Sequence, residues 1–112
     1  MSQDSHILLE QYAEDVCHPE VSGFELLDLL STRSALVEGE ASLSLAERRR
    51  LEEADARLLA AAPIVLARLV EIAPLPELRQ RVNASPSHWW WYLDLLQRTT
   101  RALSSPENKE AD

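Results

Sequence analysis

One stretch, residues 45–73, carries a helical pattern long enough to organise the rest of the chain, and Ser44 and Glu47 at its start have the spacing of a capping box. Its apolar residues recur at the three- and four-residue spacing that places side chains on one face of an α-helix. They are Leu51, Ala54, Leu58, Ala61, Ala62, Val65, Leu69 and Ile72. Pro63 interrupts the stretch without shifting this phase, although a proline inside a helix removes one hydrogen bond and clashes with the preceding turn. The pattern therefore predicts one helix kinked at Pro63, and two helices meeting at Ala62 are the alternative.

The first helix of the chain is expected to begin at a cap on Ser2 or Asp4 and to end near Cys17. It should end there because His18 precedes a proline, and a residue in that position is pushed out of the helical conformation. One face of this helix carries apolar residues, namely Leu8, Tyr12 and Val16. This arrangement is typical of a helix that covers a core on one side.

A second helix is predicted by the capping-box spacing of Ser22 and Glu25, in which each side chain bonds the free backbone N–H group of the other residue. It should extend to about Glu38. Gly39 is a natural stop, because glycine tolerates the left-handed conformation that closes many helices. The residues expected to face the core are Phe24, Leu27, Leu30 and Val37, with Leu26 and Leu29 widening that face.

The densest aromatic stretch follows a short helix that is expected over residues 76–82. Ser85 followed by Pro86 is typical of a helix start, since serine caps free N–H groups and proline at the first helical position loses no hydrogen bond. A further helix is therefore expected over residues 86–103, and His88 in its first turn is expected to face solvent. Residues 104–112 contain no large apolar side chain and are expected to form a disordered acidic tail.

Trp89, Trp90 and Trp91 are adjacent, and three adjacent side chains on a helix cannot all enter one core. At about 100° per residue, Trp89 joins the apolar stripe of its helix, whereas Trp90 falls on the polar side near Asp94. Trp91 lies on a third side, beside Arg98. We therefore predict that Trp90 and Trp91, with these two charged neighbours, belong to a partner-binding surface, because exposed aromatic anchors are typical of interfaces. The alternative is that Trp90 covers a neighbouring helix or loop.

All of the net charge of the chain lies in its N-terminal third. Residues 1–40 hold nine acidic residues against Arg33 alone, which gives −8, and residues 41–112 hold ten acidic and ten basic residues. Such a surface repels the phosphates of nucleic acids and anionic membranes, and it attracts basic partners. A solvated face that only aids solubility is the alternative. The acidic residues predicted to bind a partner are Glu14, Asp15, Glu25 and Asp28.

Composition favours a single helical domain. Two glycines in 112 residues are few for a sheet-rich fold, which needs more turn residues. The predicted fold is all-α, a bundle of four main helices with a short fifth around the kinked helix, in one domain over residues 1–103. Cys17 is the single cysteine and cannot form an internal disulfide. Neither a signal peptide nor a membrane-spanning stretch is visible, so the expected location is the cytoplasm.

No arrangement of residues indicates catalysis, a metal or a cofactor. His6 and Cys17 share a face of the first helix but are about 16 Å apart, and the Glu-x-x-His motif of di-iron bundles does not occur. Cys17 and His18 point about 100° apart on a helix, so the imidazole cannot readily activate the thiol. Four arginines surrounded by acidic residues are interpreted as ion-pair partners rather than a nucleic-acid site: Arg48, Arg49, Arg50 and Arg57.

The function that these features favour is non-enzymatic. The chain is expected to be a small interaction or regulatory protein that binds another protein with a basic or mixed surface, or a second copy of itself, and direct nucleic-acid binding is disfavoured. Two other classes stay open. An acidic inhibitor or antitoxin-like mimic of nucleic acid would place its carboxylates in the basic groove of an enzyme. A small-molecule-binding helical bundle would use His88 and the tryptophans around a pocket.

Overall fold

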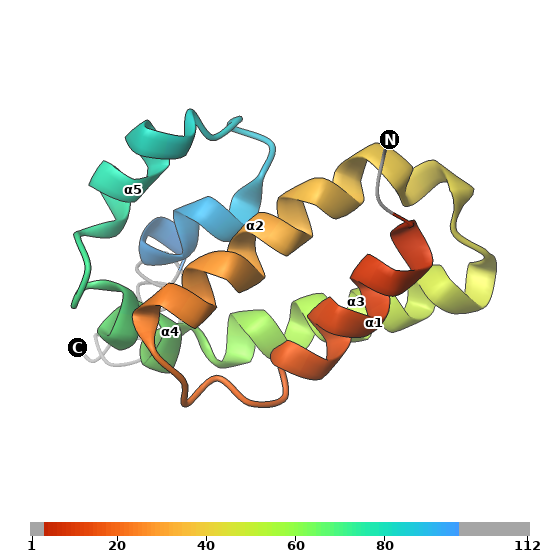
Figure 1. The fold of residues 1–112 in the computed structure, drawn as a ribbon, viewed down its shortest axis with the longest axis horizontal. Helices are drawn as coiled ribbons and strands as arrows, with labels where there is room; N and C mark the ends of the chain where they lie inside the picture. The colour runs from red at the N-terminus through yellow and green to blue at the C-terminus, as the bar shows by residue number, and fades with distance from the viewer. Residues whose placement is uncertain (1–3, 97–112) are drawn as a thin grey trace, which may run out of the picture.

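The computed structural model describes residues 4–96, and these residues form helices joined by short loops, without a strand (Figure 1). In chain order the helices are α1 (Ser5–Asp15), α2 (Gly23–Gly39), the 3₁₀ helix η1 (Glu40–Ser42), α3 (Leu45–Ala60), α4 (Ala62–Leu69), α5 (Leu75–Val82) and the 3₁₀ helix η2 (Trp89–Tyr92). The all-α class predicted from the sequence is confirmed. Within this range no helix has both the length and the apolar character needed to cross a membrane.

The central helix is α2. It contacts α1, α4 and η2, and α1 also contacts α3. Figure 1 shows α1 and α3 toward one end of α2, and α4, α5 and η2 toward the other end. A four-helix bundle is not confirmed, and α2 contacts members of both groups, whereas α3 and α4 of the stretch 45–73 lie in one group each.

The helix starts agree with the predicted capping residues. Asp4 caps α1 by accepting a hydrogen bond from the backbone N–H of His6 at 2.9 Å, and Ser22 caps α2 through the N–H of Glu25 at 3.2 Å. The capping box at the start of α3 has both of its bonds, from Ser44 and from Glu47. Such caps satisfy N–H groups that have no partner inside the helix.

The predicted kinked helix is two helices. Ala61 separates α3 from α4, with φ of −90° and ψ of 4°, and Pro63 lies in the first turn of α4. The favoured prediction of one continuous helix is therefore wrong, and the alternative is right to within one residue. The physical reason is that proline lacks the N–H group that a helix interior requires but fits a first turn. The break is one residue long, so apolar residues on both sides still face the core: Leu51, Ala54, Leu58, Ala62, Val65 and Leu69.

The buried face of α2 differs from the predicted one. Phe24 and Val37 are exposed, and the residues that face the core are Leu26, Leu29, Leu30, Arg33 and Leu36. Apolar residues in α2 fit two overlapping faces at helical spacing. The second face contains a charged residue, which is why the sequence pattern alone favours the wrong one.

Gly39 does not take the predicted left-handed conformation, because its φ is −107° and the chain runs on into η1. Both glycines are instead close-approach positions. A Cβ atom on Gly39 would lie 1.7 Å from Ser5 Oγ at the start of α1, and a Cβ atom on Gly23 would lie 2.6 Å from the backbone oxygen of Arg68. These two glycines therefore let the ends of α2 approach α1 and α4 closely.

The helix predicted from Pro86 begins later. α5 ends at Val82 and is capped by Asn83, which has the left-handed φ of 53°. Ser85 Oγ then accepts a hydrogen bond from the N–H of Ser87 within a turn. Regular structure starts only with η2, and residues 93–96 continue as an α-helix. The predicted helix end near residue 103 and the predicted tail lie outside the described residues.

Candidate functional site

Trp90 and Trp91 are buried, each with 2% of its surface exposed. Their indole N–H groups both donate to Ser34 Oγ on α2, each at 2.9 Å. The predicted exposure of these two rings is wrong, and the alternative, that Trp90 covers a neighbouring helix, is right. A 3₁₀ helix advances about 120° per residue rather than 100°, and it starts after a turn, so the helical projection used for the prediction does not apply. These rings offer no surface on which a partner could dock.

The guanidinium of Arg33 lies over the ring of Trp90, with 4.3 Å between its central carbon and the ring centroid. Along one edge of the guanidinium, Nε and Nη2 of Arg33 donate to the two carboxylate oxygens of Asp55, at 2.9 and 3.0 Å. The hydroxyl of Tyr12 donates to the same carboxylate at 2.6 Å. One buried polar network therefore connects α1, α2, α3 and η2.

Arg33 is only 4% exposed, and such a group must be paired to remain charged. Burial alone lowers the pKa of Arg33, but the hydrogen bonds and the charge of Asp55 raise it above its ordinary value, so the guanidinium stays charged. Burial, and then the charge of Asp55, raise the pKa of Tyr12 well above its usual range, so its hydroxyl keeps the proton that it donates. The network holds four elements together, and within the described residues the Nη1 atom of Arg33 is buried without a hydrogen-bond partner.

His88 is half-buried and stacks on Trp90, with ring centroids 4.7 Å apart and an interplanar angle of 18°. The expectation that it faces solvent is therefore only partly right. Because the ring lies on a core tryptophan, it belongs to the same packed cluster.

Asp94 is held within the molecule rather than offered to a partner. Arg79 Nη1 donates to Asp94 Oδ1 at 2.6 Å and to the backbone oxygen of Trp91 at 3.0 Å. The guanidinium also lies 4.7 Å from the ring centroid of Tyr92. Arg98, the other charged residue predicted beside the tryptophans, lies outside the described residues. Trp90, Trp91 and Asp94 of the predicted site thus make internal contacts with α2 and α5.

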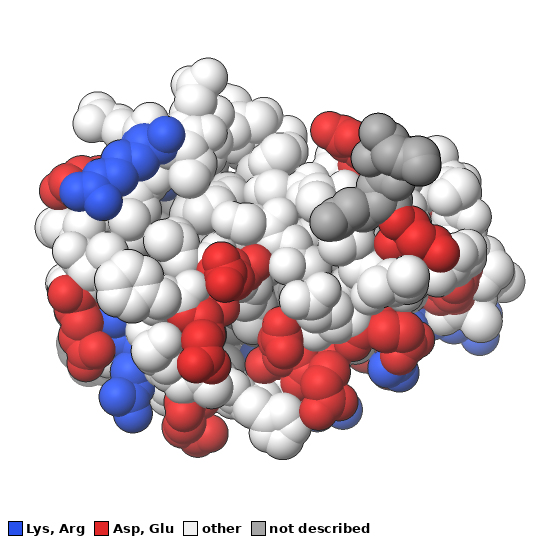
Figure 2. Space-filling model, in the orientation of Figure 1, with Lys and Arg blue, Asp and Glu red and all other residues white. Residues whose placement is uncertain are grey.

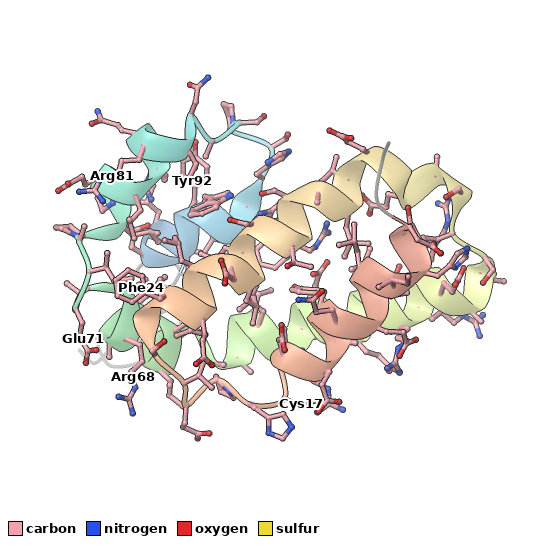
Figure 3. All side chains as sticks on the ribbon, in the orientation of Figure 1. Cys17, Phe24, Arg68, Glu71, Arg81 and Tyr92 are labelled. Atoms are coloured by element: carbon pink, nitrogen blue, oxygen red, sulfur yellow. The ribbon has the colours of Figure 1, made fainter. Side chains whose placement is uncertain are left out.

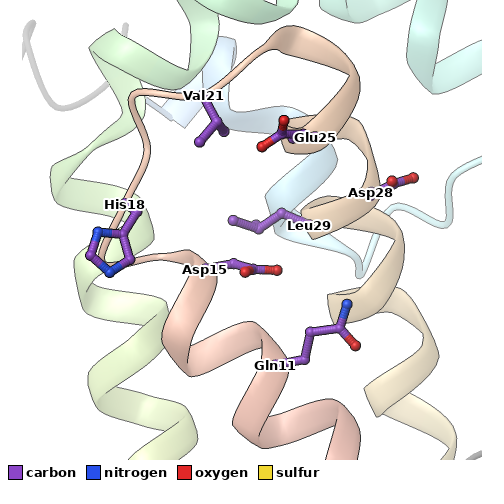
Figure 4. A pocket seen from close by; sticks show the side chains of 7 residues that line it. All are labelled: Gln11, Asp15, His18, Val21, Glu25, Asp28 and Leu29. Atoms are coloured by element: carbon purple, nitrogen blue, oxygen red, sulfur yellow. The ribbon is translucent and has the colours of Figure 1, made fainter.

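The predicted acidic residues lie on neighbouring elements. Glu14 and Asp15 are at the end of α1, and Glu25 and Asp28 are in the first two turns of α2. A pocket of about 250 Å³ lies between these helices, lined by Gln11, Asp15, His18, Val21, Glu25, Asp28 and Leu29. Figure 4 shows Asp15 and Glu25 in the space between α1 and α2, with Asp28 at the outer edge of α2. Figure 2 shows acidic side chains gathered on this side of the molecule.

Several negatively charged carboxylates lie close together around this pocket. Burial, and then the charges of Glu14, Glu25 and Asp28, raise the pKa of Asp15. Glu14 has a partner, since His18 Nε2 lies 3.2 Å from its Oε2. Among residues 4–96, none of the three carboxylates that line the pocket pairs with a lysine or arginine. A cation entering the pocket would therefore relieve repulsion that already exists.

Phe24 is 70% exposed and lies in the first turn of α2. The chain has six aromatic residues besides its histidines, and the other five are buried or half-buried. Sequence analysis assigned Phe24 to the core and so missed it as a surface residue. The sequence feature that could have revealed this is the second apolar face of α2. That face contains Leu26 and Leu30, and when it is buried, Phe24 points outward.

Several of the other polar residues considered from the sequence have partners within the molecule. Arg50 pairs with Glu10 at 2.9 Å, as predicted, whereas Arg48 donates to the backbone oxygens of Ala41 and Leu43. Cys17 is exposed and donates to the backbone oxygen of Ala13 at 3.4 Å. Within the described part of the chain, no group of three histidine, cysteine, aspartate or glutamate side chains could hold a metal ion.

No protein-family model, curated protein or solved structure matches this chain.

Proposed function

We propose that this chain is a non-enzymatic, cytoplasmic binding module that holds a basic segment of another protein on its acidic face. The acidic face is defined here as the surface formed by Glu14, Asp15, Glu25 and Asp28. The observation that carries the proposal is that three carboxylates without a lysine or arginine partner among the described residues line one pocket between α1 and α2.

Electrostatics explains why a basic segment fits. Burial, and then the charges of Glu14, Glu25 and Asp28, raise the pKa of Asp15, so this carboxylate is held next to like charge. A lysine or arginine of a partner would lower this repulsion, and the attraction would steer association and weaken at high salt. Because protonation removes the charge of Asp15, binding should also weaken as the pH falls through the raised pKa of this carboxyl.

The experiment compares two variants with the same net charge. The pocket variant carries Asp15→Asn, Glu25→Gln and Asp28→Asn. The control variant carries Glu38→Gln, Glu52→Gln and Glu53→Gln, three exposed acidic residues elsewhere on α2 and α3. Both are titrated with a lysine- and arginine-containing peptide without large apolar residues, at about 50 mM and about 300 mM salt.

The proposal predicts that the wild type and the control bind the peptide at low salt, and that the pocket variant binds at least about tenfold more weakly, a loss of about 1.4 kcal/mol. Equal weakening in the two variants would mean that only the net charge matters. That result would overturn the proposal in favour of an acidic surface that merely aids solubility.

A further inference from the structure

The exposure of Phe24 is fixed by the backbone below it. Gly23 packs against the end of α4 so closely that an added Cβ would meet the backbone oxygen of Arg68 at 2.6 Å and the side chain of Ile72 at 3.1 Å. The next turn of α2 directs Leu26 and Leu30 into the core, where both are fully buried. Turning Phe24 inward would require breaking both contacts, so the ring stays on the surface.

Phe24 and the acidic face form one continuous surface. Asp28 follows Phe24 by four residues on α2, so the two side chains lie on the same side of the helix, about 6 Å apart along its axis. Asp28 also lines the pocket with Asp15 and Glu25. Figure 3 shows Phe24 on the same side of the molecule as Glu71 and Arg68 of the α4 end.

Charge decides between the possible occupants of this surface. A large exposed ring attracts any apolar group, but the carboxylates beside Phe24 repel acidic partners. A second copy of the chain that presented the same surface would bring Asp15, Glu25 and Asp28 against themselves, and such like-charge contacts are unfavourable. The occupant that fits both features carries a large apolar side chain next to lysine or arginine.

We infer that Phe24 is the apolar anchor of the acidic face and that the partner segment is amphipathic, with one large apolar residue flanked by basic residues. This inference rests on the proposed function, and it adds the apolar half of the recognition. The ring supplies contact area that does not depend on salt, while the pocket carboxylates supply the charge that selects a basic segment.

The test uses two basic peptides of about 15 residues that differ at one position, which is leucine in the anchored peptide and serine in the other. Each peptide is titrated with the wild type, with Phe24→Ala and with the control Leu45→Ala. Leu45 is a matched control, because it is 69% exposed and lies at the start of α3, away from the pocket. Circular dichroism checks that all three proteins keep the same helix content.

The inference predicts that the wild type and Leu45→Ala bind the anchored peptide at least about tenfold more tightly than the serine peptide, the ratio expected from burying one apolar side chain. Phe24→Ala should lose this preference and keep its salt-dependent binding of both peptides. If the wild type binds both peptides equally while the pocket variant is impaired, the inference is wrong and the proposed function stands. If the pocket variant binds as well as the control variant, the proposed function is wrong as well.

Discussion

The Trp89–Tyr92 segment and the first turn of α2 both carry aromatic rings, yet only the single phenylalanine of α2 faces solvent. In the first region, both buried indole N–H groups reach Ser34 Oγ, and the Arg33 guanidinium covers the ring of Trp90. In the second, Phe24 lies above Gly23, which is packed against α4. A buried indole needs an acceptor for its N–H group. Whether aromatic side chains are buried therefore depends on the contacts that the facing helix offers them, and not on how many rings lie together.

The buried and exposed sides of α2 differ in the same way. Its inner side buries a charged residue, Arg33, which pairs with the carboxylate of Asp55 and lies over the ring of Trp90. Its outer side exposes an apolar residue, Phe24, beside carboxylates that have no basic partner. The free energy of unfolding is thus expected to depend on the inner side of α2, and binding on its outer side. Substitutions on one side should therefore change one property and leave the other unchanged.

The largest expected effect comes from removing Arg33. Arg33→Met leaves the Asp55 carboxylate without its cation and Trp90 without its stacking partner, so we expect a loss of about 3 kcal/mol in the free energy of unfolding. Urea denaturation followed by circular dichroism measures this loss. Asp55→Leu in the same chain should recover part of it, because replacing both members of a buried ion pair is less harmful than replacing one. A loss of less than about 1 kcal/mol in the single variant would contradict this role of Arg33.

A smaller effect is expected at Ser34. Ser34→Ala removes the acceptor of two buried indole N–H groups, and an unsatisfied buried donor costs about 1–3 kcal/mol. We expect a loss of about 2 kcal/mol in the free energy of unfolding, together with a change in tryptophan fluorescence. Binding of the basic peptides should not change, since Ser34 does not line the acidic pocket. Unaltered stability would show that the indoles find other acceptors.

The smallest effect is expected at an exposed pair, His6 with Glu47, which joins α1 to α3. The hydrogen bond and charge of Glu47 raise the pKa of His6, and the capping bonds of Ser44, then His6, lower the pKa of Glu47. The stabilisation is therefore fully present below the unfolded pKa of histidine, near 6.5, and is lost as the pH rises through the raised pKa of His6. His6→Gln should be slightly less stable than the wild type near pH 5.5 and equally stable near pH 8.5. A difference independent of pH would exclude the ion pair as its cause.

Much of the helical framework could be predicted from local signals. Asp4, Ser22 and Ser44 cap helices where their spacing predicted, because a cap depends only on residues within one turn. The acidic residues of the pocket were predicted as a set from charge alone, and the α1–α2 packing brings them together.

The errors arise where tertiary contacts override local pattern. Arg33 looks like a surface residue until Asp55 and Trp90, both distant in sequence, are placed around it. Phe24 looks like a core residue because helical spacing alone cannot say which of two overlapping faces of α2 meets α1. The tryptophans were misplaced because their backbone is a 3₁₀ helix that begins after a turn, which the serine-proline signal does not reveal.

The most direct test of this contrast is the free energy of unfolding of two variants, Trp90→Ala and Phe24→Ala, measured by urea denaturation with circular dichroism. Trp90→Ala should lose at least about 3 kcal/mol, as large-to-small changes of buried aromatic residues do. Phe24→Ala should stay within about 0.5 kcal/mol of the wild type, as exposed positions do. Equal losses in the two variants, or a tolerated Trp90→Ala beside a destabilised Phe24→Ala, would contradict the account.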